Sequence, residues 1–254
     1  MRALVLGGGG IAGIAWETGI LYGLGDDVLD VDLIIGTSAG SAVAAAVTSG
    51  VPLAELFERQ LTPVPENAGN SGPPLDRLIE IFTAAQGLPP ERGRRKLGEL
   101  ALSTDTMPED VWKARIGSGL PSHEWPSQHI ATVAVDTETG EYRIFDRNSG
   151  VDLLSAVAAS CAVPGVYPPV TIDGKRYMDG GMRTTTNADL VADYDEILDI
   201  APIPDALNVP NARVITPDAG SQSAMTANPL NPATRTPSAH AGLAQGKAFE
   251  APHQ

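Results

Sequence analysis

Short apolar runs alternate with segments of helical spacing along most of this chain. A run that is almost entirely apolar, such as 130–135, predicts a strand buried on both faces, and apolar positions three to four residues apart predict a helix. The strands expected from this pattern are 3–6, 31–35, 130–136, 141–145, 170–172, 176–178, 196–201 and 212–216. The segments of helical spacing are 14–21, 41–47, 75–86 and 153–159. Strands that alternate with helices are typical of an α/β fold, here a three-layer α/β/α arrangement with a mainly parallel central sheet.

Two segments break this alternation. Residues 57–128 are rich in proline, and proline interrupts long elements, so we expect a helical insertion there that covers a site as a lid. Residues 217–254 have the small-residue spacing of a C-terminal helical tail. Because a length of 254 residues suits one α/β domain, we expect a single domain over residues 1–254.

The segment 36–40, Gly-Thr-Ser-Ala-Gly, has the pattern of a nucleophile elbow. It follows an apolar strand and precedes a helix of small residues. Gly36 and Gly40 allow the sharp turn and a close approach of strand and helix, which leaves the Ser38 hydroxyl exposed at a helix N-terminus. Ser38 is therefore a candidate nucleophile.

A glycine-rich loop, residues 7–13, follows the first predicted strand and opens the first predicted helix. Gly8, Gly10 and Gly13 fit the G-x-G-x-x-G fingerprint of dinucleotide-binding proteins. That fingerprint needs an acidic residue at the end of the next strand, whereas Asp30 and Asp32 lie at its start. The alternative is an oxyanion hole, because in a parallel sheet this loop and Ser38 open at the same edge. We favour the oxyanion hole over a nucleotide-binding or purely structural loop.

A candidate base follows a predicted hairpin. The sequence Asp-Gly-Lys at 173–175 joins two short strands, and the second strand leads into Asp179, Gly180 and Gly181. An aspartate at a strand end beside two glycines lies on a loop, where active-site groups are common. Taken alone, Asp179 would more often be a turn-capping residue.

These three motifs, in this order, resemble the patatin-like phospholipase family of bacterial type. The run 156–169 that leads to the aspartate strand is similar to that family as well, and the resemblance covers about 1–50 and 130–215. It implies a serine acyl hydrolase that cleaves carboxylic esters of lipids through an acyl-enzyme, with a Ser–Asp dyad and no cofactor. Many relatives carry Arg or Lys where this chain has Ala12.

The resemblance also assigns roles to individual residues. It implies that Ser38 is the nucleophile and Asp179 its general base. The backbone expected to form the oxyanion hole belongs to Gly8, Gly9 and Gly10. The glycines expected to shape the elbow and the aspartate motif are Gly36, Gly40, Gly180 and Gly181.

Two further functions remain open. One is an α/β-hydrolase triad with His240, which has the right chain order but an elbow that comes too early for that fold. The other is a non-catalytic nucleotide-binding module that uses the glycine loop. No metal site is expected, because the histidines, His123, His129, His240 and His253, have no ligand-type spacing.

Composition and charge limit the classes of binding partner that the protein can have. The net charge of −14 disfavours binding to nucleic acid and to anionic lipid surfaces, so any contact with a membrane surface would be transient and hydrophobic. Cys161 is the only cysteine and the sequence has no targeting or membrane-spanning segment, so we expect a cytoplasmic protein. We expect Cys161 to pack in the core. The substrate headgroup, the acyl length and the oligomeric state leave no signal in the sequence.

Overall fold

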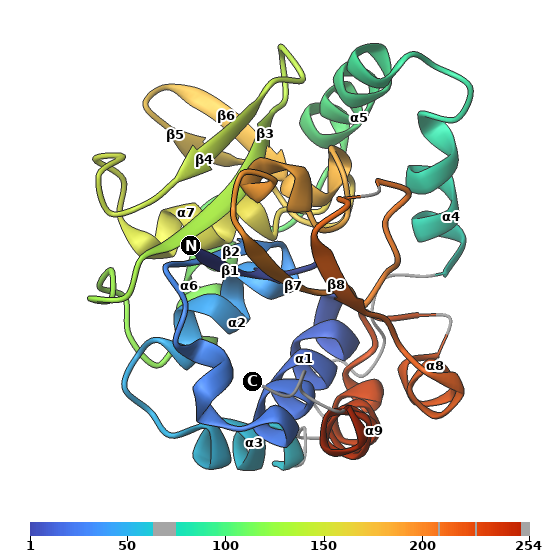
Figure 1. The fold of residues 1–254 in the computed structure, drawn as a ribbon. Coiled ribbons are helices and arrows are strands. Elements are labelled where there is room, and N and C mark those ends of the chain that lie inside the picture. Colours follow the sequence, from blue (N-terminus) through green and yellow to red (C-terminus); the bar gives the residue numbers. More distant parts are fainter. Residues whose placement is uncertain (63–74, 208, 227, 250–254) are drawn as a thin grey trace.

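A mainly parallel sheet forms the centre of the protein (Figure 1). The computed structural model describes residues 1–62, 75–207, 209–226 and 228–249. In these residues the strands are β1 (Arg2–Leu6), β2 (Leu33–Thr37), β3 (Ile130–Asp136), β4 (Tyr142–Phe145), β5 (Val170–Ile172), β6 (Lys175–Asp179), β7 (Glu196–Ile200) and β8 (Ala212–Ile215). Their order is β5-β6-β3-β2-β1-β7-β8, and β4 also pairs with β3. The predicted α/β fold is confirmed.

The strand directions separate two parts of the sheet. The strands β1, β2, β3, β7 and β8 are parallel to one another, as the apolar runs predict. The hairpin strand β6 runs antiparallel to β3 and to β5, and β4 is antiparallel to β3 on the opposite side. Antiparallel strands thus lie on both sides of β3.

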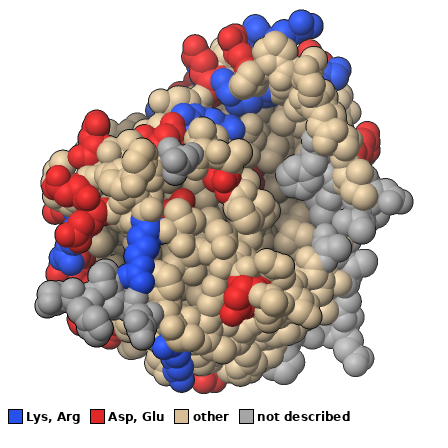
Figure 2. Space-filling view, turned by 45° about the vertical axis from the view of Figure 1, so that its right-hand side comes forward, with Lys and Arg blue, Asp and Glu red and all other residues tan. Residues whose placement is uncertain are grey.

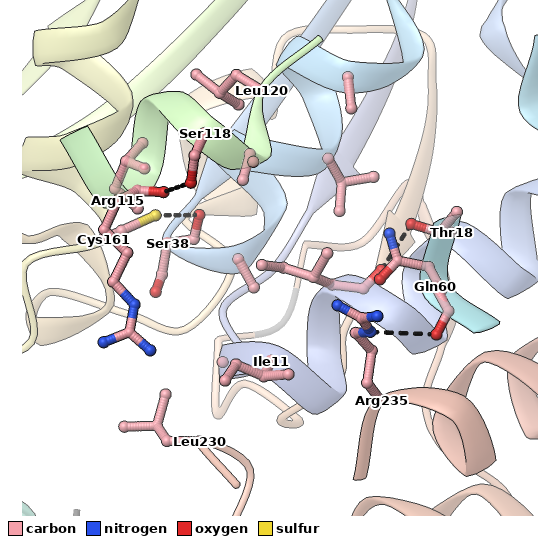
Figure 3. Close-up of a pocket in the computed structure, with 18 of the residues that line it drawn as sticks. Ile11, Thr18, Ser38, Gln60, Arg115, Ser118, Leu120, Cys161, Leu230 and Arg235 are labelled. Atoms are coloured by element: carbon pink, nitrogen blue, oxygen red, sulfur yellow. Dashed lines mark hydrogen bonds between the residues drawn. The ribbon is translucent and has the colours of Figure 1, made fainter. Parts of the chain in front are cut away.

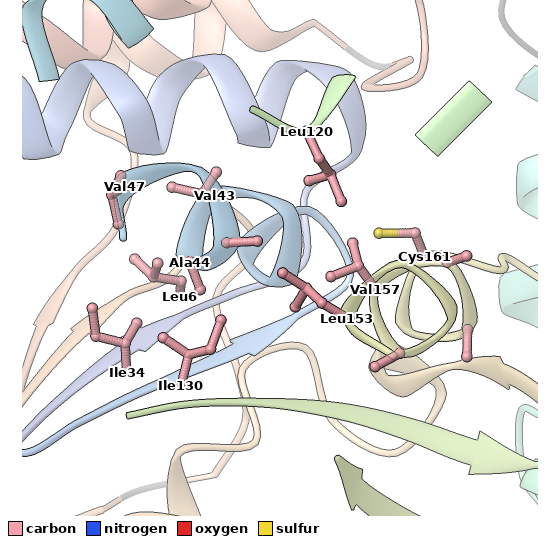
Figure 4. Packing of buried hydrophobic residues seen from close by; sticks show 14 of the residues in the cluster. Leu6, Ile34, Val43, Ala44, Val47, Leu120, Ile130, Leu153, Val157 and Cys161 are labelled. Carbon is pink, nitrogen blue, oxygen red and sulfur yellow. The ribbon is translucent and has the colours of Figure 1, made fainter. Parts of the chain in front are cut away.

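Helices cover the first face of the sheet. The helices α1 (Gly10–Leu24), α2 (Ala39–Val47) and α7 (Leu153–Ser160) pack on strand side chains such as Leu6, Ile34 and Ile130. Figure 4 shows α2 and α7 side by side above these strands, with Ala44 on the side of α2 that faces the strands and Val43 on its opposite side. Alternate strand residues point to this face because successive side chains of a strand point to opposite sides.

The second face is covered by two separate groups of elements. The 3-10 helix η3 (Ala188–Val191) packs on Val5, Ile35 and Val133. The helices α4 (Leu75–Ala84) and α5 (Pro90–Ser103) pack near Val135 and Met178, at the antiparallel edge. The predicted three-layer arrangement is therefore present, with a thinner second layer.

The proline-rich segment 57–128 contains helices joined by turns and loops where the structure describes it, and its residues 63–74 lie outside the described part. Besides α4 and α5 it contains the end of α3 (Leu53–Leu61) and all of α6 (Glu109–Gly119). Pro52, Pro89 and Pro108 immediately precede α3, α5 and α6, as expected for a residue that cannot continue a helix from upstream. The remaining elements are η1 (Asp26–Leu29), η2 (Gly180–Met182), α8 (Ala219–Met225), η4 (Pro232–Thr234) and α9 (Arg235–Ala248).

The predicted C-terminal tail, 217–254, contains α8 and α9 in its described residues, and α9 packs directly on α1. A Cβ atom on Gly19 would lie 2.3 Å from the carbonyl oxygen of Ala239, and one on Gly242 would lie 2.2 Å from that of Trp16. Glycine is required at these positions because the two backbones touch. This contact fixes α1, whose first turn carries the glycine loop. Among the described residues, no helix combines the length and the apolar character that crossing a membrane requires.

Candidate active site

Ser38 lies at the turn between β2 and α2, as the elbow motif predicts, but the residue is only 9% exposed rather than open to solvent. Its backbone dihedrals are φ 53° and ψ −119°, a conformation that non-glycine residues rarely adopt. A Cβ atom on Gly40 would lie 2.0 Å from the carbonyl oxygen of Leu6, and one on Gly36 would lie 2.5 Å from that of Gly40. The two glycines therefore allow α2 to start directly above the strands, and the surrounding contacts hold Ser38 in its strained turn.

Strand register brings Ser38 and Asp179 together. On β3, Val133 pairs with Thr37 of β2, and the next residue, Ala134, pairs with Asp179 of β6. Because β4 occupies the other side of β3, β2 and β6 lie on the same side and meet end to end. Each strand end carries one functional side chain, and the Ser38 hydroxyl donates to the Asp179 Oδ2 atom at 2.6 Å.

The environment of Asp179 changes its proton affinity. The side chain is almost fully buried, and this burial raises the pKa of Asp179 to about 7. Hydrogen bonds from the Ser38 hydroxyl and from the Gly181 N–H, which lies 2.7 Å from Oδ1, oppose the increase. The hydrogen bond from the Gly181 N–H therefore orients the carboxylate, and the hydrogen bond from the Ser38 hydroxyl joins it to Ser38. The pKa of Asp179 lies near neutral pH.

The glycine loop offers fewer free donors than the sequence suggests. The Gly7 N–H donates to the Ile200 carbonyl at 3.0 Å, and the Gly8 N–H donates to the Thr185 carbonyl at 2.7 Å. In the described part of the chain, no hydrogen bond engages the N–H groups of Gly9 and Gly10. These two groups lie at the N-terminus of α1, where the helix dipole favours negative charge. Of the three expected donors, Gly8 already has an acceptor within the protein.

The space around the loop glycines differs from position to position. A Cβ atom on Gly9 would lie 2.5 Å from the Cβ atom of Pro202, and Gly10 has φ 62°. A Cβ atom on Gly8 would meet Ser38 Cβ at an ordinary 3.5 Å. Side chains at Gly9 and Gly10 thus disturb folding, whereas a methyl group at Gly8 changes the site itself.

Two cavities meet at Ser38. A small one of about 70 Å³ is lined by the glycine loop, Ser38, Asp179 and Gly181. A larger one of about 510 Å³ extends from Ser38 between α2 and the helices α3, α6 and α9 (Figure 3). Its apolar lining includes Ile14, Ala42, Val43, Ala46, Ile116 and Leu120. Ser38 is therefore at the junction of a small cavity beside the glycine loop and a larger, mainly apolar one.

Comparison with known proteins identifies the family. A family model for the patatin-like phospholipase matches residues 4–192, which is more than half of the chain. The chain belongs to the patatin-like phospholipase family. All three predicted motifs of this patatin-like chain lie inside the matched range, whereas α8 and α9 lie outside it.

Two solved structures are similar at low identity. VipD from Legionella pneumophila is 12% identical, with a TM-score of 0.42 over 85% of this chain and 49% of that protein. The type III effector protein ExoU is 16% identical, with a TM-score of 0.37 over 98% of this chain and 53% of that protein. This patatin-like chain thus spans about half the length of either protein.

The backbone of Ser38 is held by side chains that the sequence patterns did not single out. The Ser38 N–H donates to the Ser160 hydroxyl at 3.0 Å, and the Ser38 carbonyl accepts from the Ser41 hydroxyl at 2.6 Å. Cys161 is buried as predicted, and its thiol also donates to the Ser38 carbonyl at 3.1 Å. Because burial raises the pKa of Cys161 to about 12, the thiol stays protonated and serves as a donor.

Asn187 connects the two strand ends of the patatin-like site. It is fully buried, and its side-chain amide donates to Thr37 Oγ1 at 3.0 Å and to the Gly180 carbonyl at 3.3 Å. Thr37 immediately precedes Ser38, and Gly180 immediately follows Asp179. Asn187 therefore fixes the spacing between Ser38 and Asp179 from outside both motifs, and no local pattern marks it.

The histidines have other contacts. His123 Nε2 forms a hydrogen bond with the Gly117 carbonyl, and His129 Nε2 lies 3.5 Å from Asp146 Oδ2. The His240 ring packs edge-on against the Phe57 ring. His253 lies outside the described residues. Within the described residues, no group of three or more His, Cys, Asp and Glu side chains is arranged to hold a metal ion.

Proposed function

We propose that this chain is a serine acyl hydrolase that cleaves carboxylic esters of lipids with Ser38 as nucleophile and Asp179 as general base. The direct 2.6 Å hydrogen bond between Ser38 Oγ and Asp179 Oδ2 carries the proposal, because a base must reach the proton that it removes. Membership of the patatin-like phospholipase family supports a lipid substrate. The apolar cavity beside Ser38 suits an acyl chain, and no cofactor takes part.

The proposed reaction has two halves. In the first, Ser38 Oγ attacks the ester carbonyl while Asp179 takes its proton, and Asp179 then protonates the leaving alcohol as the C–O bond breaks. In the second, Asp179 removes a proton from water, the hydroxide attacks the acyl-enzyme, and the proton returns to Ser38 Oγ as the acid leaves. The negative oxygen formed in both halves would be stabilised by the N–H groups of Gly9 and Gly10, with Gly8 holding the loop in place.

The two other functions are less well supported by the geometry. In a triad an imidazole lies between serine and aspartate, whereas here these two side chains bond directly and His240 packs against Phe57. A dinucleotide site would need an acid near the end of β2. Asp30 and Asp32 instead bond Arg2, at the opposite end of the strands.

A fluorophosphonate probe tests the proposal. We expect the wild-type protein to hydrolyse p-nitrophenyl butyrate and to gain one phosphonyl group on Ser38, read by peptide mass spectrometry. Ser38→Ala should prevent both, whereas Ser118→Ala, which changes a serine that lines the same cavity, should prevent neither. A label on another residue, or hydrolysis unaffected by Ser38→Ala, would contradict the proposal.

A further inference from the structure

The large cavity differs in charge from the rest of the protein. The chain has 31 Asp and Glu residues against 17 Lys and Arg. The described residues that line the cavity nevertheless include Arg59, Arg115 and Arg235 and no acidic residue. Figure 2 shows that the centre of one face is largely uncharged, with charged side chains of both signs toward its edges. Among the described residues that line the cavity, all the charged side chains are therefore positive.

The three arginines differ in what already binds them. Arg59 forms an ion pair with Glu55 at 2.9 Å. Arg235 donates from Nε to the Gln60 carbonyl at 3.2 Å and also donates to the Thr62 carbonyl. Within the described residues, the Arg115 guanidinium has neither an ion pair nor a hydrogen bond. Arg115 is thus the cation with the most donors available for a bound molecule.

The helix that carries Arg115 is held firmly against the protein core. Trp112, one turn earlier on α6, is buried, donates from Nε1 to the Ala158 carbonyl at 3.0 Å and stacks on Tyr167 with ring centres 3.9 Å apart. Residues three apart share one helix face, so this anchor turns Arg115 toward the cavity. Figure 3 shows its guanidinium on the Ser38 side of the cavity, with Arg235 on the other side of Ile11.

We propose that Arg115 binds a phosphate group of the substrate while Ser38 attacks an acyl ester of the same molecule. This assignment rests on the proposed acyl hydrolase activity and narrows its substrate to phosphate-bearing acyl esters. A guanidinium presents paired N–H donors that match the geometry of a phosphate group. The overall negative charge of the protein disfavours phosphate elsewhere, so Arg115 would select the group at the site itself.

Soluble short-chain lipids test this assignment without a membrane. Dihexanoyl phosphatidylglycerol and dihexanoylglycerol, both below their aggregation concentrations, differ in the phosphate-bearing headgroup. We expect Arg115→Gln to lower kcat/KM for the phospholipid by about 10- to 100-fold and to leave that for the neutral lipid nearly unchanged. Arg115→Lys should restore part of the loss, since it keeps the charge without the paired donors.

Arg59→Gln is the matched control, because Arg59 lines the same cavity but is already paired with Glu55. It should change the ratio of the two kcat/KM values by less than about threefold, the size expected for an exposed ion pair. Inhibition by octanoate shows whether Arg115 instead binds the carboxylate of a released fatty acid. Thermal melting confirms that each variant is folded.

The possible results distinguish a failure of the proposed activity from a failure of the phosphate assignment. If wild-type protein hydrolyses neither lipid nor p-nitrophenyl butyrate, the proposed activity itself is wrong. If it hydrolyses them and Arg115→Gln behaves like Arg59→Gln, or lowers both lipids equally, the activity stands and the phosphate assignment is overturned. Weaker inhibition by octanoate with an unchanged lipid preference also overturns it, because Arg115 then binds a carboxylate.

Discussion

The two sides of the large cavity are built in different ways. On the sheet side, Ser38 and Asp179 are positioned by backbone: a strained turn, strand register and glycines in contact with carbonyl groups. On the helical side, α3, α6 and α9 present long side chains such as Arg59, Arg115 and Arg235, of which Arg59 and Arg115 are exposed.

We infer from this difference that the sheet side of the cavity sets the rate of the reaction and that the helical side sets the choice of substrate. Backbone positions cannot shift without moving the strands, so the sheet side tolerates little change and suits groups whose alignment sets the rate. Side chains on helices can be exchanged without altering the fold, so the helical side suits groups that choose the substrate. Changes on the sheet side should therefore affect every ester, and changes on the helical side only some of them.

The largest effect should come from Ser38→Ala. Removal of the hydroxyl removes the group that accepts the acyl chain, and loss of the nucleophile in a serine hydrolase costs about a millionfold in kcat. Turnover of p-nitrophenyl esters of every chain length should fall to background, while the circular dichroism spectrum stays that of the wild type. Residual activity above about a hundredth of wild type would mean that another group forms the acyl-enzyme.

Asp179→Asn should have the next largest effect. Asparagine keeps the shape of the side chain but cannot accept the Ser38 proton, and general-base catalysis is worth about 10²- to 10⁴-fold. We expect this loss for short and long esters alike, measured as kcat/KM. Normal turnover with asparagine would instead assign Asp179 a turn-forming role.

The same residue predicts a pH dependence of activity and of stability. Only the ionised carboxylate acts as base, so kcat/KM should fall about tenfold per unit below pH 7, where the pKa of Asp179 lies, and level off above it. Because this pKa is higher in the folded protein than in the unfolded chain, ionisation costs folding free energy, from nothing below about pH 4 to the full amount above about pH 7. Asp179→Asn should therefore melt no lower than wild type at pH 8, as read by calorimetry. A clearly lower Tm would show that the carboxylate stabilises the fold.

Gly8→Ala should have an intermediate effect. The added methyl group would lie 3.5 Å from Ser38 Cβ, which leaves room for folding but occupies space where the ester carbonyl must approach. Misplacement of a substrate by about 1 Å can cost about 100-fold, so we expect a loss of that size in kcat for all esters with an unchanged Tm. Wild-type kinetics would show that the substrate does not approach Ser38 past Gly8.

Sequence patterns located the residues whose chemistry depends on local structure. Ser38 is a candidate because a strand end, a sharp turn and neighbouring glycines are consecutive in the sequence, whereas Asp179 alone would suit a turn and is a candidate base only through the resemblance of all three motifs to one family. The same holds for the strands and for α1, α2, α4 and α7, whose apolar spacing is local. The parallel sheet followed from their alternation.

Contacts between distant segments could not be found in this way. The Gly8 N–H donates to the Thr185 carbonyl, and the Asn187 side chain bridges Thr37 and Gly180. No local sequence pattern near Gly8 or Asn187 indicates these partners. Arg115 likewise belongs to a proline-rich segment whose sequence predicts helices but not the surface that they face. Tertiary packing alone decides which exposed charge reaches the cavity.

The smallest effect should come from Ala46→Phe, and it should depend on chain length. Ala42 and Ala46 line the cavity one and two turns of α2 beyond Ser38, so Ala46 lies about 12 Å along the helix from the nucleophile. A phenyl group there shortens the cavity at its far end and leaves the space next to Ser38 open. We expect kcat/KM for p-nitrophenyl palmitate to fall about tenfold, in line with the 1–3 kcal/mol that a hydrophobic pocket gains or loses through such changes, while that for the butyrate is unchanged. The butyrate assay in the same variant is the control for folding and for the dyad. An equal loss for both esters would show that α2 has shifted and that the helical and sheet sides of the cavity are not independent, whereas no loss for either would place the acyl chain elsewhere.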